Sequence, residues 1–159
     1  MLPVFAGGPI QVVIRRSLGP HLAATTLTRR RILLDAEVLN KRGEFERILI
    51  HEIFHFVWRR MGNPARASWE SVLRREIKAA ARGELGWSAE WRKAKLGRRE
   101  SVQRTRAWRR YVCESFCDTA AWRFAGLGSH DEFTLPGRFR RVRRRWFDTT
   151  LSATEAIPI

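Results

Sequence analysis

The sequence feature that most constrains the fold is a change in the spacing of apolar residues at Glu44. The segment EFERILIHEIFHFVWRR, which starts there, has apolar residues three and four positions apart, at Phe45, Ile48, Leu49, Ile53, Phe56 and Val57. This period places them on one broad face of a helix. Gly62-Asn63-Pro64 follows and is typical of a helix end.

The residues before this helix favour strands instead. Residues 10–16, IQVVIRR, are rich in β-branched side chains and lie between Gly-Pro pairs, and residues 31–36, RILLDA, form a similar run. Between them, residues 23–28, AATTLT, are compatible either with a third short strand or with a loop. The first part of the chain is therefore expected to form a small sheet.

The residues after this helix are expected to be mainly helical. We predict helices over 67–82, 89–96, 100–125 and 138–147, with Ser88 as N-cap of the second, and a capping-box pattern at Ser129 and Glu132. The expected fold class is α+β: a mostly helical minimal domain with a small N-terminal sheet packed on the helix that begins at Glu44. A single domain over 1–159 is expected, with 150–159 as a loose tail.

The charge of the chain is strongly positive. Lys and Arg number 31 against 16 Asp and Glu, which gives a net charge of +15 that attracts polyanions such as nucleic acid or acidic peptides. The sequence has no stretch apolar enough for a transmembrane segment and no secretory signal pattern. Cys113 and Cys117 lie four residues apart in one predicted helix, a poor geometry for a disulfide, and a cytoplasmic protein is therefore expected.

The segment HEIFH at 51–55 carries the clearest chemical signal. His51 and His55 lie on the same face of the predicted helix, so both imidazoles can bind one Zn²⁺ ion. Glu52 lies one position further round, where a general base could take a proton from a zinc-activated water. Half of the four histidines in the chain occur in this motif. A pair of hydrogen-bonded histidines without a metal is the simpler alternative.

A third ligand has to come from elsewhere in the chain. The extended metzincin pattern fails because Trp58 and Met61 stand where it requires Gly and His. Glu114 and Asp118 lie four residues apart in an aromatic-rich predicted helix, where buried carboxylates need partners. A metal ion on Glu114 and an imidazole N–H on Asp118 would satisfy both. Cys113 and Cys117 remain alternative soft ligands.

The motifs HEIFH and CESFCD, on successive helices, resemble the gluzincin (thermolysin-like) branch of zinc metalloproteases. This resemblance implies that His51, His55 and Glu114 are zinc ligands and that Glu52 is the general base. It also implies that Asp118 is the partner of a ligand histidine, with His51 favoured over His55. It also implies that an edge strand within residues 26–36 binds extended substrate.

Hydrolysis at zinc normally needs a further donor for the oxyanion. Tyr111, one turn before Glu114, and His130, in a following loop, are the candidate catalytic donors, although each is more often found in a structural role. His21 has less support. The expected function is a zinc metallopeptidase or amidase whose partner is a peptide or protein substrate, with the charge favouring an acidic one. A catalytically inactive zinc domain with a regulatory role and a basic protein that binds nucleic acid remain the alternatives.

Overall fold

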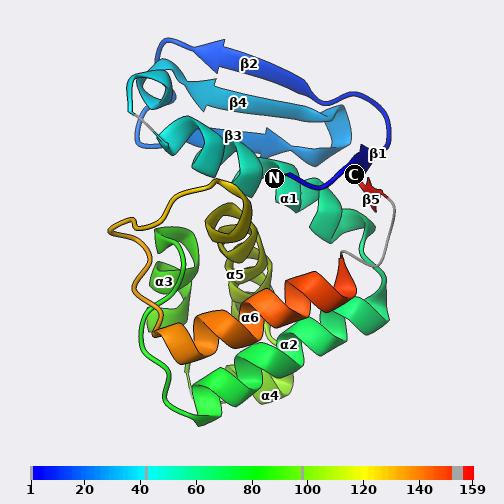
Figure 1. The fold of residues 1–159 in the computed structure, drawn as a ribbon, viewed down its shortest axis with the longest axis vertical. Coiled ribbons are helices and arrows are strands. Elements are labelled where there is room, and N and C mark those ends of the chain that lie inside the picture. The colour runs from blue at the N-terminus through cyan, green and yellow to red at the C-terminus, as the bar shows by residue number, and fades with distance from the viewer. Residues whose placement is uncertain (1, 42, 98, 152–155) are drawn as a thin grey trace.

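The computed structural model describes residues 2–41, 43–97, 99–151 and 156–159. It has the expected α+β fold. In Figure 1 the three-stranded sheet lies on one side of helix α1 (Glu44–Arg60), and most of the other helices lie on the opposite side. They are α2 (Asn63–Lys78), α3 (Trp87–Ala94), α4 (Glu100–Gln103), α5 (Arg106–Phe124) and α6 (Gly137–Thr150).

The sheet has the strand order β2 (Gln11–Arg15), β4 (Arg31–Asp35), β3 (Ala23–Thr26). Strand β4 is central, parallel to β2 and antiparallel to β3. Both predicted strands are confirmed, and the ambiguous segment 23–28 forms β3 and the start of a 3₁₀ turn at Leu27–Arg29. The prediction that the edge strand lies within residues 26–36 is wrong. Strand β4, which occupies most of that range, pairs with a strand on each side, and the edge strand that contacts α1 is β3.

Helix α1 is buried on two sides, which explains its broad apolar face. Ile48 and Phe56 pack with the sheet residues Ile32 and Leu34. The side chains of Ile50, Phe54 and Val57 join the larger core formed with α2, α5 and α6. The helix ends at Arg60, as the Gly-Asn-Pro sequence predicts. Because α1 joins the two cores, its polar residues are held in fixed positions between them.

Two predicted helix boundaries are wrong for local reasons. Helix α2 begins at Asn63 rather than 67, because Pro64 fits the first turn of a helix, where its missing N–H costs nothing. The helix predicted over 100–125 is broken into α4 and α5 at Arg104, which has a left-handed φ of 48°. Thr105 then caps α5 by accepting a hydrogen bond from the backbone N–H of Trp108.

The predicted caps at Ser88 and Ser129 are also absent. Helix α3 begins at Trp87 with Gly86 in the N-cap position, and no side chain of its own caps it. Residues 129–132 form no helix. The carboxylate of Glu132 instead accepts a hydrogen bond from the backbone N–H of Trp87, so it caps α3 from a distant part of the chain.

The prediction of a loose tail is wrong for the last residues of the chain. Strand β5 (Ile157–Pro158) pairs in parallel with β1 (Phe5–Ala6), and the side chain of Ile157 is buried in the main core. Residues 152–155 lie outside the described part of the chain. Among the described residues, no helix combines the length and the apolar character that crossing a membrane requires.

Candidate metal centre

The two histidines of the HEIFH motif lie next to each other on α1 and face α5. Their Nε2 atoms are 3.2 Å apart. His51 is almost fully buried and His55 is half-buried. The i, i+4 spacing on a rigid helix that is packed on two sides therefore brings both imidazoles to one point, as predicted.

Glu114 on α5 completes a triangle of ligand atoms. Its Oε2 lies 3.3 Å from His51 Nε2 and 4.0 Å from His55 Nε2. Around tetrahedral zinc with bonds of about 2.0–2.2 Å, ligand atoms are about 3.3–3.6 Å apart. Two edges of the triangle are close to this range, and the third is slightly longer. The structure thus brings the three predicted ligands together at spacings that could hold a metal ion.

Glu114 is held in the ionised form that a metal ligand needs. Burial alone would raise its pKa, but hydrogen bonding to His51 and the charges of His51, His55 and Arg92 lower this pKa to about 2. The guanidinium of Arg92, on α3, lies 3.3 Å from the second carboxylate oxygen, Oε1. Arg92 therefore occupies one oxygen and leaves the other to face the two imidazoles.

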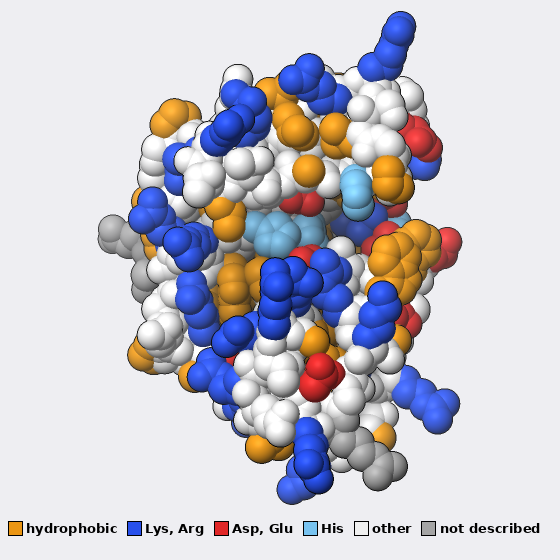
Figure 2. Space-filling model, turned by 180° about the vertical axis from the view of Figure 1, so that it is seen from behind, with side chains coloured by type: hydrophobic (Ala, Val, Ile, Leu, Met, Phe, Trp, Pro, Cys, Tyr) orange, Lys and Arg blue, Asp and Glu red, His pale blue; other side chains and the backbone are white. Residues whose placement is uncertain are grey.

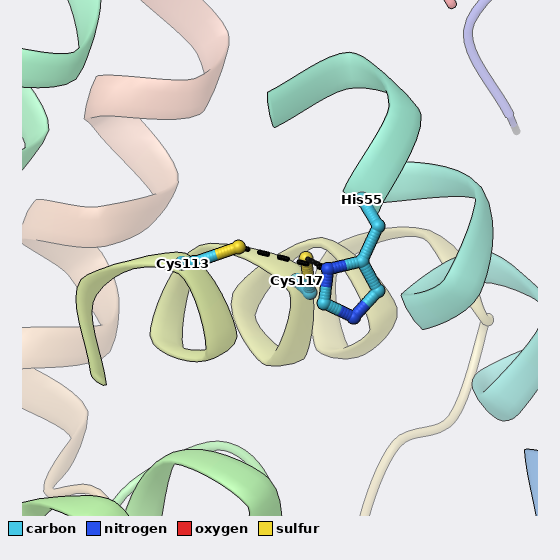
Figure 3. A group of neighbouring side chains, drawn as sticks. All are labelled: His55, Cys113 and Cys117. Carbon is cyan, nitrogen blue, oxygen red and sulfur yellow. Dashed lines mark hydrogen bonds between the residues drawn. The ribbon is translucent and has the colours of Figure 1, made fainter. Parts of the chain in front are cut away.

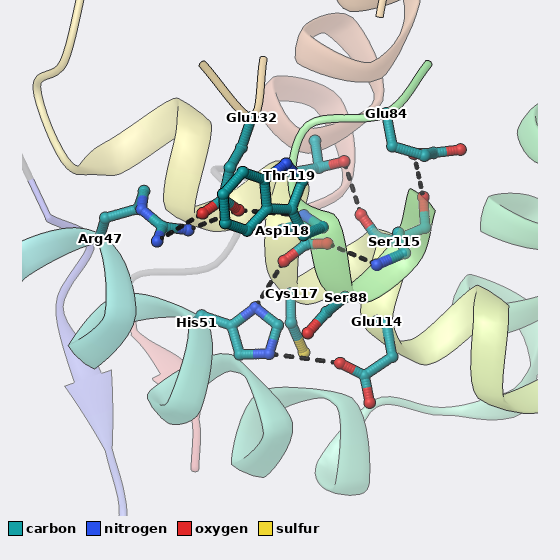
Figure 4. Close-up of polar contacts among 12 residues, drawn as sticks. Arg47, His51, Glu84, Ser88, Glu114, Ser115, Cys117, Asp118, Thr119 and Glu132 are labelled. Atoms are coloured by element: carbon teal, nitrogen blue, oxygen red, sulfur yellow. Dashed lines mark hydrogen bonds and ion pairs between the residues drawn. The ribbon is translucent and has the colours of Figure 1, made fainter. Parts of the chain in front are cut away.

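Asp118 orients His51 from the opposite side of the ring (Figure 4). Its Oδ1 lies 2.7 Å from His51 Nδ1, while its Oδ2 accepts a hydrogen bond from the backbone N–H of Ala89. Burial alone would lower the pKa of His51, but Asp118 and Glu114 outweigh it and raise this pKa well above 6.5. A carboxylate on the second nitrogen is the usual partner of a zinc-binding histidine, and it directs Nε2 to the metal.

The second nitrogen of His55 faces two sulfur atoms (Figure 3). The Sγ atoms of Cys113 and Cys117 lie 3.6 and 3.5 Å from His55 Nδ1. Both cysteines are free, and a hydrogen bond from Cys117, together with the nearby His55, lowers the pKa of Cys113 to about 6. The sulfurs and Nδ1 form a close group of their own. They contact the ring atom opposite Nε2, so they lie on the wrong side of His55 to share an ion with His51 Nε2.

Glu52 is the other carboxylate close to the two histidines. The hydroxyl of Thr25, on the edge strand β3, donates a 2.5 Å hydrogen bond to its Oε2. This contact draws Glu52 toward the sheet, whereas Glu114 approaches the imidazoles from α5. Both carboxylates lie beside the imidazoles, because Glu52 also offers an oxygen within 4.8 Å of the ligand atoms of His51 and His55.

The cluster opens into a cleft between β3 and α3. Two adjoining hollows of about 330 and 300 Å³ share His21, Ala23, His51, Glu52 and Ser88 in their walls. Figure 2 shows histidine side chains in a depression of the surface, surrounded by Lys and Arg side chains. The candidate ligands therefore line a cleft that opens to the surface.

The structure does not bring Tyr111 and His130 to this cleft. Tyr111 is fully buried, and its hydroxyl donates a 2.6 Å hydrogen bond to Glu84. His130 Nε2 lies 2.6 Å from Glu44 Oε1 at the start of α1. Neither residue lines either hollow.

Three polar residues with little or no predicted role in the site line the cleft: His21, the least supported of the donor candidates, Ser88, predicted only as a helix cap, and Arg92, for which no role was predicted. His21 and Ser88 border both hollows, and Arg92 borders the hollow that contains His55 and Glu114. His21 lies two residues before the edge strand β3, which is a signal that could have given it more weight. Arg92 had no distinguishing signal, because it is one of many basic residues.

Comparison of the chain with protein-family models, with curated proteins and with solved structures finds no match.

Proposed function

We propose that the protein is a zinc-dependent hydrolase, acting as a peptidase or amidase, with Glu52 as its general base. The observation that carries the proposal is the meeting of His51, His55 and Glu114 from two helices, with one oxygen and two nitrogens 3.2–4.0 Å apart. The arrangement resembles the gluzincin site that the sequence motifs imply.

The residues have separate roles in this proposal. Zinc held by the three ligands would supply Lewis acidity that lowers the pKa of a water to about 7 and polarises a carbonyl. Glu52, held by Thr25 at the edge of the cleft, accepts the proton of the attacking water and delivers it to the leaving amine. His21, Ser88 and Arg92 line the cleft with side chains that can donate a hydrogen bond to an oxyanion.

Strand β3 suits a polypeptide substrate. It pairs with β4 on one side, and Ala23, Ala24 and Thr25 line the cleft on the other. Backbone groups at a free strand edge can pair with an extended peptide. Such pairing would lay a peptide bond across the cleft beside Glu52.

The variant Glu52→Gln tests the proposal. The zinc-loaded variant should retain one equivalent of zinc and hydrolyse a synthetic peptide library roughly 100 to 10,000 times more slowly than the parent, as measured by mass spectrometry. Glu46→Gln, an exposed residue on the same helix, is the matched control and should hydrolyse at the parent rate. Glu114→Gln should lose zinc.

The outcomes separate the alternatives. Hydrolysis by Glu52→Gln at the parent rate would exclude the general-base role. Zinc binding through His51, His55 and Glu114 without hydrolysis of any peptide would favour a regulatory zinc domain. A protein that binds no zinc would leave the basic surface, and with it nucleic acid, as the better explanation.

A further inference from the structure

A third hollow, of about 340 Å³, adjoins the metal cleft and is strongly basic. It is lined by Trp91, Arg92, Lys95, Ala107 and Arg110, from α3 and the first turns of α5. Arg92 also lines the metal cleft, and Trp91 also lines the hollow beside His51 and Glu52. The basic hollow therefore shares wall residues with the site where hydrolysis is proposed.

The positive charge of this hollow is not neutralised within the part of the chain that the structure describes. Arg92 contacts Glu114, but no described carboxylate forms an ion pair with Lys95 or Arg110, and none lines the hollow. The side chains of Lys95 and Arg110 are exposed. Their charges lie beside the N-terminal turn of α5, whose backbone dipole adds to the positive potential. An anionic group entering the hollow would gain charge-assisted hydrogen bonds without displacing an existing partner.

An aromatic wall lies between the basic hollow and the cleft. The rings of Trp87 and Trp91 stack at 6.1 Å between centroids and 18° between planes. Trp91 is nevertheless 62% exposed, which is unusual for so large an apolar side chain. Exposed aromatic residues next to cations are typical of binding surfaces.

We propose that the hollow of Trp91, Arg92, Lys95 and Arg110 is a subsite that binds an acidic side chain of the peptide substrate. The inference depends on the proposed hydrolase function. The occupant is a peptide because the same cleft is bordered by the free edge of β3, whose backbone groups match an extended polypeptide. Arg92 extends from Glu114 to the hollow, so the acidic residue lies close to the bond that is hydrolysed.

The test measures how the zinc-loaded chain of 159 residues hydrolyses two sets of peptides. One set carries Asp or Glu at the positions that flank the cleaved bond, and the other carries Asn or Gln at the same positions. The parent should hydrolyse the acidic set with a kcat/KM about tenfold higher, as expected from one charge-assisted hydrogen bond, mainly through a lower KM. The double variant K95E/R110E should abolish or reverse this preference.

The double variant R141E/R145E is the matched control. It makes the same change in net charge on exposed positions of α6, which line neither the cleft nor the basic hollow. It should retain the parent's preference for acidic peptides. If both double variants reduce the preference equally, the overall field of the protein explains the selectivity and the subsite is rejected.

Other outcomes distinguish this inference from the proposed function. Hydrolysis of both peptide sets with equal kcat/KM would overturn the subsite and leave the hydrolase intact. If the parent hydrolyses neither set, the hydrolase proposal fails. Fluorescence anisotropy with a labelled acidic peptide then tests the subsite by itself. Binding that is lost in K95E/R110E would support the subsite, whereas no binding, or binding that this variant retains, would reject it. The same assay can be run with labelled oligothymidylate. If it binds more tightly than the peptide and depends equally on Lys95 and Arg110, nucleic acid rather than an acidic peptide is the ligand of the hollow.

Discussion

Asp118 and His51 form a short polar contact between the two helices of the candidate metal centre. Asp118 Oδ1 lies 2.7 Å from His51 Nδ1, and the other oxygen of the carboxylate accepts the backbone N–H of Ala89 at 2.8 Å. One side chain of α5 therefore orients a candidate ligand on α1 and caps the N-terminus of α3. Because α3 also carries Arg92, the geometry of the ligands is coupled to the wall of the cleft.

Replacing Asp118 by Asn should weaken zinc binding by about 10- to 100-fold. The amide keeps the shape of the side chain but loses the charge that makes His51 a basic ligand of fixed tautomer. Competition with a chromophoric chelator measures the affinity. Asp148→Asn, which removes an exposed pair with Arg123, is the control and should bind zinc as the parent does. Equal affinities for the two variants would show that Asp118 does not support the metal.

Gly86→Ala should disturb the same carboxylate by steric contact. A Cβ at this position would lie 2.2 Å from Asp118 Cγ and 2.4 Å from its Oδ1, so the carboxylate or the helix would have to move. The backbone of Gly86 is extended, with φ 178°, so the substitution adds no backbone strain of its own. We expect a loss of about 1–3 kcal/mol in the free energy of unfolding, together with weaker zinc binding.

Gly128→Ala is the control for this substitution, because a Cβ there would meet nothing within 4 Å. Chemical denaturation and chelator competition should leave it close to the parent. If Gly86→Ala binds zinc with parental affinity, the close approach of Gly86 to Asp118 is not needed to position His51.

The variant C113S/C117S should retain zinc. Both sulfurs contact Nδ1 of His55, whereas the proposed metal lies at its Nε2, so hydroxyls can replace the thiols as partners of the ring. Zinc content by elemental analysis and affinity by chelator competition provide the measurement. Loss of zinc in C113S/C117S, with retention in Glu114→Gln, would identify the cysteines as ligands in place of Glu114.

The clustering of the candidate ligands could be predicted because the signals that point to them are local. The i, i+4 spacing of His51 and His55 depends on the helix alone, and the helix was evident from its apolar period. Glu114 and Asp118 stood out as a carboxylate pair in an aromatic-rich segment, and the structure places both against His51. In each case the residues that define the prediction lie within one or two helical turns.

What could not be predicted depends on contacts between distant segments. Tyr111 looked like a catalytic donor because nothing near it in sequence reveals Glu84, its hydrogen-bond partner 27 residues away. The N-terminus of α3 is capped by Asp118 and Glu132, from other parts of the chain, so no capping signal precedes it. The docking of Ile157 beside β1 likewise joins the two ends of the chain.

A buried ionic network behind the metal site predicts the effect of a further substitution. Arg143 is completely buried and contacts Glu76 and Glu84 at 2.6 and 2.7 Å. Arg143→Met would leave both carboxylates buried without this partner, at a cost of about 3–5 kcal/mol in the free energy of unfolding. Denaturant unfolding measures the loss, and Arg141→Met, at an exposed position, should change stability by less than about 0.5 kcal/mol. Similar stabilities for the two variants would contradict a structural role for the network.

The same network predicts how stability depends on acid. Burial alone would raise the pKa of Glu84, but the charges of Arg143 and Lys93 outweigh it and hold this pKa below its ordinary value of 4.5. The unfolded chain therefore binds the proton more readily than the folded protein. The stabilisation from Glu84 is fully present above pH 4.5 and is lost as the pH falls through the lower folded pKa.

Urea unfolding of the zinc-free protein, in a chelator, from pH 6 downward should show this loss, with a steeper fall in the parent than in Glu84→Gln. The chelator removes the effect of acid on metal binding. His51 adds little slope below about pH 5, because a histidine with the ordinary pKa of 6.5 is then protonated in the unfolded chain, and the raised pKa of His51 keeps it protonated in the folded protein as well. Glu46→Gln, which alters an exposed carboxylate, should follow the parent curve. If Glu84→Gln follows it as well, the carboxylate of Glu84 does not titrate differently on folding, and the acid sensitivity has to come from another group.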